Sequence, residues 1–213
     1  MATVLLTDTA QPWVSPLAKA LVDRGYTVDT NGGLVGEGRS ALRPRRAAVA
    51  VLSAGEAAPT RTQVAELRAN TGASVIVLIE GGNFLDRLET YEAGADDCLS
   101  EPVRADRLLD VIGPLTGWRG RLDAEAAGDA GPGYLPIERR ILAALVDQAG
   151  RSVTVQQLIV EVWGPGRSDE EAVARLYLGS LRRKLAAALP GRWRLVTDAT
   201  GYRLLPASPS DQE

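Results

Sequence analysis

Residues 154–185 read TVQQLIVEVWGPGRSDEEAVARLYLGSLRRKL and predict two short helices separated by a glycine-rich turn at 164–166. Each predicted helix opens on a capping box, in which Gln or Glu follows Thr or Ser by three positions and pairs with backbone groups at the helix start. The two boxes are Thr154 with Gln157 and Ser168 with Glu171. The second helix ends in three cations, Arg182, Arg183 and Lys184. A helix, a turn and a cationic helix are the elements that place a protein in the major groove of DNA.

The composition argues against an enzyme. The chain of 213 residues contains no histidine, which removes the commonest general base, the Ser-His and Cys-His pairs and most zinc sites. Its single cysteine, Cys98, excludes an internal disulfide and suits a reducing compartment. No apolar run approaches the roughly 20 residues that span a bilayer, and the start MATVLLTDT lacks a cationic leader. We therefore expect a cytoplasmic, non-enzymatic protein with no cofactor, metal or membrane partner.

Charge is distributed unevenly along the chain. Residues 130–205 contain 11 Arg or Lys against 7 Asp or Glu, a balance of +4, whereas residues 1–129 contain 13 against 18, a balance of −5. A mildly acidic module followed by a basic one is typical of a regulatory domain joined to a nucleic-acid reader. Ordinary surface variation is the competing explanation.

The first half of the chain alternates short apolar runs with helical patterns. The expected strands are 4–6, 26–28, 47–52, 74–79 and 97–100. The expected helices are 15–24, 60–69, 84–92 and 103–112. Strands alternating with helices over about 115 residues predict an α/β fold with a doubly wound, flavodoxin-like parallel sheet. Ligands of such sheets bind where the strands end.

The segment YEAGADDCLSEP at residues 91–102 resembles the GADDY-L-x-K-P segment of response-regulator receiver domains, and the first module has that family's length and element order. In the family, acidic residues after the first strand bind Mg²⁺ and an Asp after the third accepts phosphate. A Thr or Ser after the fourth strand and a Lys after the fifth respond to that phosphate. The matching positions here form a degenerate phosphorylation pocket: Thr7, Asp8, Thr9, Ser53 (or Leu52 with a different gap), Ile79 and Glu101.

This pocket lacks the groups that phosphorylation requires, because Ser53 is not a carboxylate and Glu101 would repel a phosphoryl group. We therefore expect an atypical receiver that dimerises, senses a ligand or does both without phosphorylation. The resemblance implies a dimer interface at charged positions of the last strand and the helices on either side of it. These positions are Arg87, Glu89, Asp97, Arg104, Asp106 and Arg107. The start LLTDTAQPW and the altered pocket also resemble the GlnR-type orphan regulators.

The glycine and alanine content of residues 117–133 predicts a flexible linker. It divides the chain into a receiver at 1–116 and a second domain at 134–206, and we expect a disordered tail at 207–213. The motifs EVWG, LRRKL and ATGYRL make the second domain similar to the winged helix of the OmpR/PhoB family. The linker leaves no room for the antiparallel platform sheet that opens the family's effector domains.

The resemblance implies that the helix ending in LRRKL lies in the major groove of double-stranded promoter or operator DNA and that the hairpin wing reaches the minor groove. The DNA-binding residues it implies are Arg175, Tyr177, Ser180, Arg182, Arg183, Lys184, Arg192, Arg194 and Thr200. Tyr177 can stack on a thymine methyl or donate to phosphate. Asp198 stands where relatives often carry a minor-groove Arg, and the potential of that groove repels a carboxylate.

The leading hypothesis is a sequence-specific DNA-binding transcriptional regulator of the OmpR/PhoB type, homodimeric and independent of phosphorylation. Residues 164–169 match the loop that in this family can touch RNA polymerase, which is a further expected partner. The alternative is a protein-interaction adaptor or polymerase-binding regulator whose winged helix contacts protein rather than DNA. Asp198 and the missing platform sheet favour this alternative.

Overall fold

The structure is a computed structural model that describes residues 2–7, 12–30, 47–54, 59–121, 133–188 and 193–206. The chain forms two compact units, unit one at residues 1–120 and unit two at residues 121–213. No helix within the described ranges is long and apolar enough to cross a lipid bilayer. The expected disordered tail at 207–213 lies outside the described residues.

Unit one is built on a parallel sheet with the strand order β2-β1-β3-β4-β5. Its strands are β1 (Thr3–Leu6), β2 (Thr27–Asp29), β3 (Val49–Ser53), β4 (Ser74–Glu80) and β5 (Asp97–Glu101). All of β3 and all but the last residue of β4 are buried, which explains their continuous apolar runs. The strand order reverses direction at β1, which has β2 on one side and β3 on the other. This reversal defines a doubly wound sheet, so the prediction of a receiver-like sheet is confirmed.

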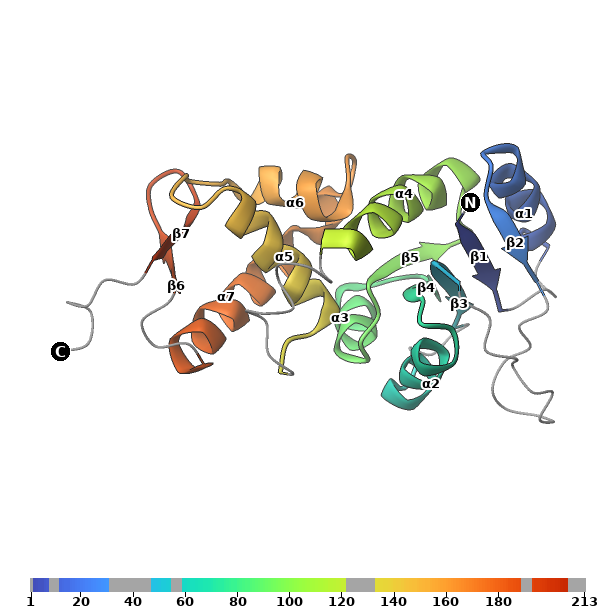
Figure 1. Cartoon of the computed structure of the whole chain (residues 1–213), viewed down its shortest axis with the longest axis horizontal. Helices are drawn as coiled ribbons and strands as arrows, with labels where there is room; N and C mark the ends of the chain where they lie inside the picture. Colours follow the sequence, from blue (N-terminus) through green and yellow to red (C-terminus); the bar gives the residue numbers. More distant parts are fainter. Residues whose placement is uncertain are drawn as a thin grey trace. The chain divides into compact units, whose positions relative to one another are not determined.

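Helices cover both faces of this sheet, as Figure 1 shows. They are α1 (Val14–Asp23), α2 (Arg61–Thr71), α3 (Phe84–Glu92) and α4 (Ala105–Arg121). Leu17 of α1 and Ile112 of α4 pack with Val51 and Ile76 in one apolar cluster, whereas α2 and α3 lie on the opposite face. Capping boxes at Thr60 and Asn83 begin α2 and α3.

Helix α4 continues past the predicted end of the receiver. It runs to Arg121 with Pro114 inside it, so residues 117–121 are helical and the predicted start of the linker was wrong. Leu115, the residue after the proline, is buried in the unit-one core and holds this turn against the sheet. Packing therefore outweighs the weak helix propensity of the local glycines. Residues 122–132 of the predicted linker lie outside the described residues.

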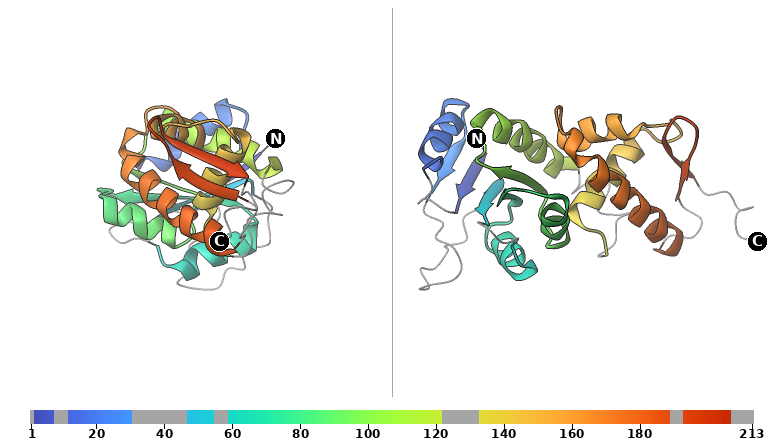
Figure 2. Two further views of the ribbon diagram at one scale, coloured as in Figure 1. Left: turned by 90° about the vertical axis from the view of Figure 1, so that its left-hand side faces the viewer. Right: turned by 180° about the vertical axis from the view of Figure 1, so that it is seen from behind.

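Unit two consists of packed helices followed by a β-hairpin. Its elements are α5 (Pro136–Asp147), α6 (Val155–Trp163), the 3-10 turn η2 (Ser168–Glu170), α7 (Glu171–Ala188), β6 (Trp193–Thr197) and β7 (Tyr202–Pro206). Strands β6 and β7 pair antiparallel, and Figure 2 shows the hairpin beside α7. Trp163 is 1% exposed and belongs to the core. Two packed helices, a long third helix and a hairpin form a winged helix-turn-helix, as predicted.

The helix starts in unit two agree with the sequence in one case and differ in the other. Thr154 and Gln157 form the predicted capping box, with Gln157 N donating to Thr154 Oγ1 at 3.1 Å. The second box does not form, because the chain enters α7 through η2 and Glu171 accepts a hydrogen bond from Arg175 instead. A buried ion pair of 2.5 Å between Arg167 and Glu170 fixes η2.

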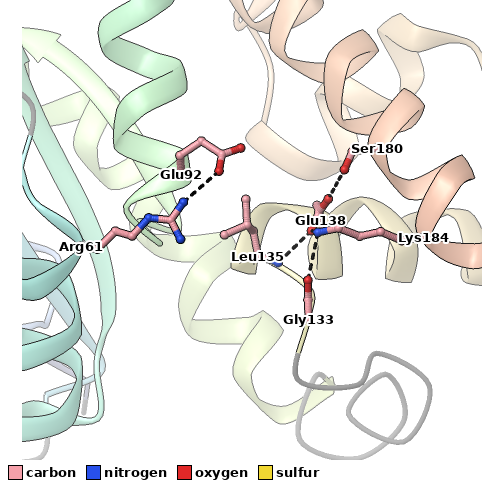
Figure 3. A network of polar contacts seen from close by, with 7 residues as sticks. All are labelled: Arg61, Glu92, Gly133, Leu135, Glu138, Ser180 and Lys184. Carbon is pink, nitrogen blue, oxygen red and sulfur yellow. Dashed lines mark hydrogen bonds and ion pairs between the residues drawn. The ribbon is translucent and has the colours of Figure 1, made fainter. Parts of the chain in front are cut away.

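A buried carboxylate joins the start of unit two to α7, as Figure 3 shows. Glu138 is 0% exposed, and its oxygens accept from Leu135 N at 2.8 Å, Ser180 Oγ at 2.7 Å and Lys184 Nζ at 2.5 Å. Lys184 also donates to Gly133 O at 2.9 Å. A carboxylate removed from water requires such donors, so this network, the Glu138 network, holds residues 133–138 against α7.

We predict that Lys184→Met destabilises the protein by about 2–3 kcal/mol, because Glu138 loses its cation inside the fold. The expected loss is smaller than for a fully buried pair because the Lys184 side chain is 34% exposed. Urea unfolding measures the change. Arg183→Met is the matched control and should stay within about 0.5 kcal/mol of the unaltered protein. Equal stability of the two variants would show that the Glu138 network contributes nothing.

Candidate nucleic-acid interface

Helix α7 has a buried face and an outward face. Its buried residues, Val173, Ala174, Tyr177, Leu178, Leu181 and Leu185, recur at helical spacing. The outward positions follow the same period, and we call them the outer stripe: Ala172, Arg175, Leu176, Gly179 and Arg183. This stripe is the surface that α7 offers to a partner, and it combines two arginines with small or apolar side chains.

Tyr177 does not belong to this outward surface. It is 1% exposed and lies four residues from both Val173 and Leu181 on the buried row, so its predicted contact with DNA was wrong. Leu176, which is 40% exposed, stands on the outer stripe and was missed. The helical spacing of the apolar residues could have identified Leu176. Residue type alone does not place a tyrosine, which suits either face of a helix, but the spacing puts Tyr177 on the buried face and Leu176 on the outward face.

The three cations at the end of LRRKL have different roles. Arg182 is exposed and donates to Leu195 O at 3.2 Å and to Thr197 Oγ1, both neutral acceptors, so its charge is retained and its position fixed against β6. Arg183 is exposed and has no ion pair or hydrogen bond to the described residues. Lys184 is instead paired with Glu138.

The other predicted DNA contacts also differ in their surroundings. Ser180 is half-buried and donates its hydroxyl to Glu138, so its oxygen can only accept in a contact with DNA, and that contact stays a prediction. Arg194 is exposed on β6, near the Arg182 side of α7, and stays a candidate. Arg192 lies outside the described residues.

The tip of the wing is organised by Asp198. Its Oδ1 accepts from Thr200 N at 2.8 Å, Thr200 Oγ1 at 2.7 Å and Ser152 Oγ at 2.9 Å, and its Oδ2 accepts from Arg203 at 2.7 Å. The hydroxyl of Thr200, followed by its backbone N–H and the hydroxyl of Ser152, holds the pKa of Asp198 well below its usual range. Thr200, predicted to bind DNA, is therefore a member of the turn. The carboxylate closes the wing, which the sequence alone did not indicate.

We predict that Asp198→Asn lowers the Tm at pH 7, because Arg203 and the turn lose an ionised acceptor. The pKa of Asp198 is depressed in the folded state, so its stabilisation is present above the unfolded pKa of about 3.9 and declines as the pH falls below it. Thermal unfolding should show a smaller Tm difference between Asp198→Asn and the unaltered protein at pH 3 than at pH 7. Asp147→Asn, at an exposed position of α5, serves as the control. A Tm difference that is independent of pH would contradict this role.

The carboxyl ends of the unit-one strands bring together two positions of the degenerate pocket. Ser53 Oγ at the end of β3 donates to Glu101 Oε1 at the end of β5, at 2.7 Å, across the width of β4. Thr7 donates its hydroxyl to Val51 O at 3.1 Å, and Ile79 is 2% exposed. Asp8 and Thr9 lie outside the described residues. The edge thus holds a neutral hydroxyl bound by a carboxylate.

The predicted charged dimer positions are only partly on the surface. Asp97 is 0% exposed and accepts from Tyr91 Oη at 3.2 Å, and Arg87 is 9% exposed and donates to Gly82 O at 3.3 Å. These two assignments were wrong, because both side chains are used within unit one.

The other four positions reach the surface to different degrees. Arg104 and Asp106 form an exposed pair at 2.9 Å, Glu89 is exposed and Arg107 is half-buried. Sequence reasoning missed two apolar residues at the start of α3, Phe84 and Leu85, which are 41% and 64% exposed.

Known proteins resemble both units. Residues 134–204 match the family described as "Transcriptional regulatory protein, C terminal". The KDP operon transcriptional regulatory protein KdpE of Escherichia coli (strain K12) is 31% identical over 67% of this chain and 72% of that protein. The transcriptional regulatory protein KdpE of Mycobacterium tuberculosis (strain H37Rv) is 30% identical over 95% and 99%. The solved structure of a RitR mutant shares the fold, with a TM-score of 0.63 and 19% identity over 96% of this chain and 99% of that one.

A receiver-like sheet joined to a winged helix defines a response regulator with a DNA-binding domain. With these relatives, the chain belongs to the OmpR/PhoB family of transcriptional response regulators. The sensory transduction protein RegX3 of Mycolicibacterium smegmatis, 26% identical over 96% of this chain and 99% of that protein, is similar as well.

Proposed function

We propose that this regulator binds specific DNA sequences as a homodimer and does so without phosphorylation of its receiver. The observation that carries the proposal is the hydrogen bond of 2.7 Å between Ser53 and Glu101. A hydroxyl stands where a carboxylate nucleophile is required, and a carboxylate stands where a cation is required. A phosphoryl group placed there would meet the negative charge of Glu101 without a compensating cation from that position.

Contact with the DNA backbone is assigned to the cations that the fold leaves outward. Arg182 and Arg183 lie in the second half of α7, and Arg194 lies on the neighbouring strand β6. Within the described ranges Arg182 is hydrogen-bonded to neutral acceptors, so it brings its full charge to a phosphate. These arginines position the helix, and the rest of the outer stripe faces the bases.

Dimerisation is supported by the start of α3. Phe84 and Leu85 are 41% and 64% exposed, and exposed apolar and aromatic side chains are typical of the centre of an interface. The sequence balance of +4 in residues 130–205 is small for a DNA reader, so two linked winged helices would gain affinity that one lacks. This apolar surface favours dimerisation over ligand sensing as the task of the receiver.

The adaptor alternative loses one of its two supports. Asp198 is paired with Arg203 and closes the wing, so its charge is not a surface left for a protein partner. The turn fixed by Arg167 and Glu170 presents exposed backbone at Pro165 and Gly166, and it stays the candidate contact for RNA polymerase. Polymerase binding through this turn is compatible with DNA binding through α7.

We predict that affinity for a site selected from random DNA falls steeply between 50 and 200 mM salt, as expected when several phosphates are neutralised. Arg183→Ala should lower the slope of log K against log salt by about 0.9, the contribution of one phosphate contact. Fluorescence anisotropy measures the slope, and Arg24→Ala in unit one is the control. Absence of salt-dependent binding would favour the adaptor alternative.

We predict that acetyl phosphate with Mg²⁺ changes neither the DNA affinity nor the oligomeric state, because the Ser53–Glu101 pair provides no acceptor carboxylate. The same anisotropy titration and analytical ultracentrifugation test this. A response to acetyl phosphate that Ser53→Ala abolishes would overturn phosphorylation independence. A response that survives in Ser53→Ala would overturn it too and place the acceptor elsewhere.

We predict that Leu85→Asp shifts the protein from dimer to monomer, because a charge at the centre of an apolar contact is costly to desolvate. Sedimentation velocity at micromolar concentration measures the change. Val22→Asp is the matched control, since Val22 is 56% exposed on α1 at the other face of the sheet and should leave the dimer intact. A dimer that tolerates Leu85→Asp would place the interface elsewhere.

A further inference from the structure

Arg175 is the most constrained exposed cation of the outer stripe. Its side chain is 55% exposed, and its Nε and Nη2 donate to the same oxygen, Glu171 Oε1, at 3.0 and 2.8 Å. Nε and Nη2 form the side-on edge of the guanidinium. One carboxylate oxygen therefore binds the side-on edge of the guanidinium. The end-on edge, formed by Nη1 and Nη2, points away from the helix turn that carries Glu171.

The carboxylate that holds Arg175 is itself fixed by another helix. Glu171 Oε2 accepts from Gln156 Nε2 of α6 at 3.1 Å. Glu171 therefore has one oxygen committed to Arg175 and the other committed to α6. The orientation of the guanidinium is set by two helices rather than by one flexible side chain, which lowers the entropy lost when it binds a partner.

The surroundings of Arg175 favour its charged form. The hydrogen bond to Glu171 raises the pKa of Arg175, and a contact with the hydroxyl of Tyr202 on β7 adds to this effect. Arginine has five N–H donors, of which Glu171 takes two, those on Nε and Nη2 that form the side-on edge. Two donors on the end-on side are left, the number that a guanine accepts through O6 and N7 in the major groove.

The neighbours of Arg175 on the stripe are suited to close approach by a base pair. Leu176 is 40% exposed and can pack on the methyl group of a thymine. Gly179, one turn further, has nothing within 4 Å of the position a Cβ would take, so no side chain separates the helix from the base edges there. Ala172, exposed one turn before Leu176, adds only a methyl group to this surface.

We propose that Arg175 reads a guanine in the major groove, positioned by Glu171 and Gln156, and that Leu176 contacts a thymine methyl in an adjacent step. This inference rests on the proposed function, because it names the bases that the winged helix recognises. Arg175 is distinct from Arg182 and Arg183, which attract phosphates whatever the sequence. A phosphate contact by Arg175 is the competing role, and the two roles differ in specificity.

The test is selection of bound sites from random DNA with the full chain, followed by affinity measurements for the selected site and for random duplex. The unaltered protein should select a site with a fixed guanine next to a thymine. Arg175→Lys keeps the charge but loses the fork, so its affinity for the selected site should fall roughly tenfold or more, with its affinity for random DNA unchanged. Glu171→Gln should lose part of the same discrimination.

A modified base makes the assignment specific. Replacing the fixed guanine by 7-deazaguanine removes the N7 acceptor, so the unaltered protein should bind the modified site more weakly than the original one. Arg175→Lys should bind the two sites with nearly equal affinity, because it has already lost the contact. Equal losses on selected and random DNA would make Arg175 a phosphate contact and overturn the inference alone. The inference is likewise overturned if Arg175→Lys selects the same guanine. No salt-dependent binding by the unaltered protein would overturn the proposed function together with it.

Discussion

A carboxylate that cannot reach water determines how unit two is assembled. Glu138 accepts from the backbone of Leu135 and from Ser180 and Lys184 of α7, so the first residues of the unit are attached to its longest helix. The linker predicted from the sequence is too short for the platform sheet that the family resemblance implies. The Glu138 network supplies a polar attachment at that end of α7, and it does so with side chains that a DNA reader would otherwise present outward.

The two units depart from their family in complementary ways. In unit one the phosphorylation positions are joined to each other, since the Ser53 hydroxyl is bound by Glu101. In unit two the acidic groups Glu138, Glu171 and Asp198 each pair with a cation of α7 or β7. For the DNA binding proposed above, the orientation of the remaining arginines would then matter more than their number.

The sequence predicted the architecture because apolar periodicity depends on local spacing. The runs at 74–79 and 47–52 became central strands, and the capping box of Thr154 formed. What the sequence missed at Ser180 and Lys184 has one cause: both are polar residues of α7 whose partner, Glu138, lies 42 and 46 residues earlier in the chain. Burial by a distant partner leaves no local pattern. Tyr177 differs, because the period of α7 already placed it inside.

One close contact in the wing has a consequence for protein engineering. A Cβ on Gly201 would lie 2.2 Å from Val153 O, and Val153 pairs with Tyr202 while Ser152 bonds to Asp198. The wing and the segment leading into α6 are therefore fitted to each other backbone to backbone. A wing with any side chain at position 201 would clash with the backbone of Val153. Recombination that respects this fit has to exchange the two stretches as one cassette, although about 45 residues separate them in the chain.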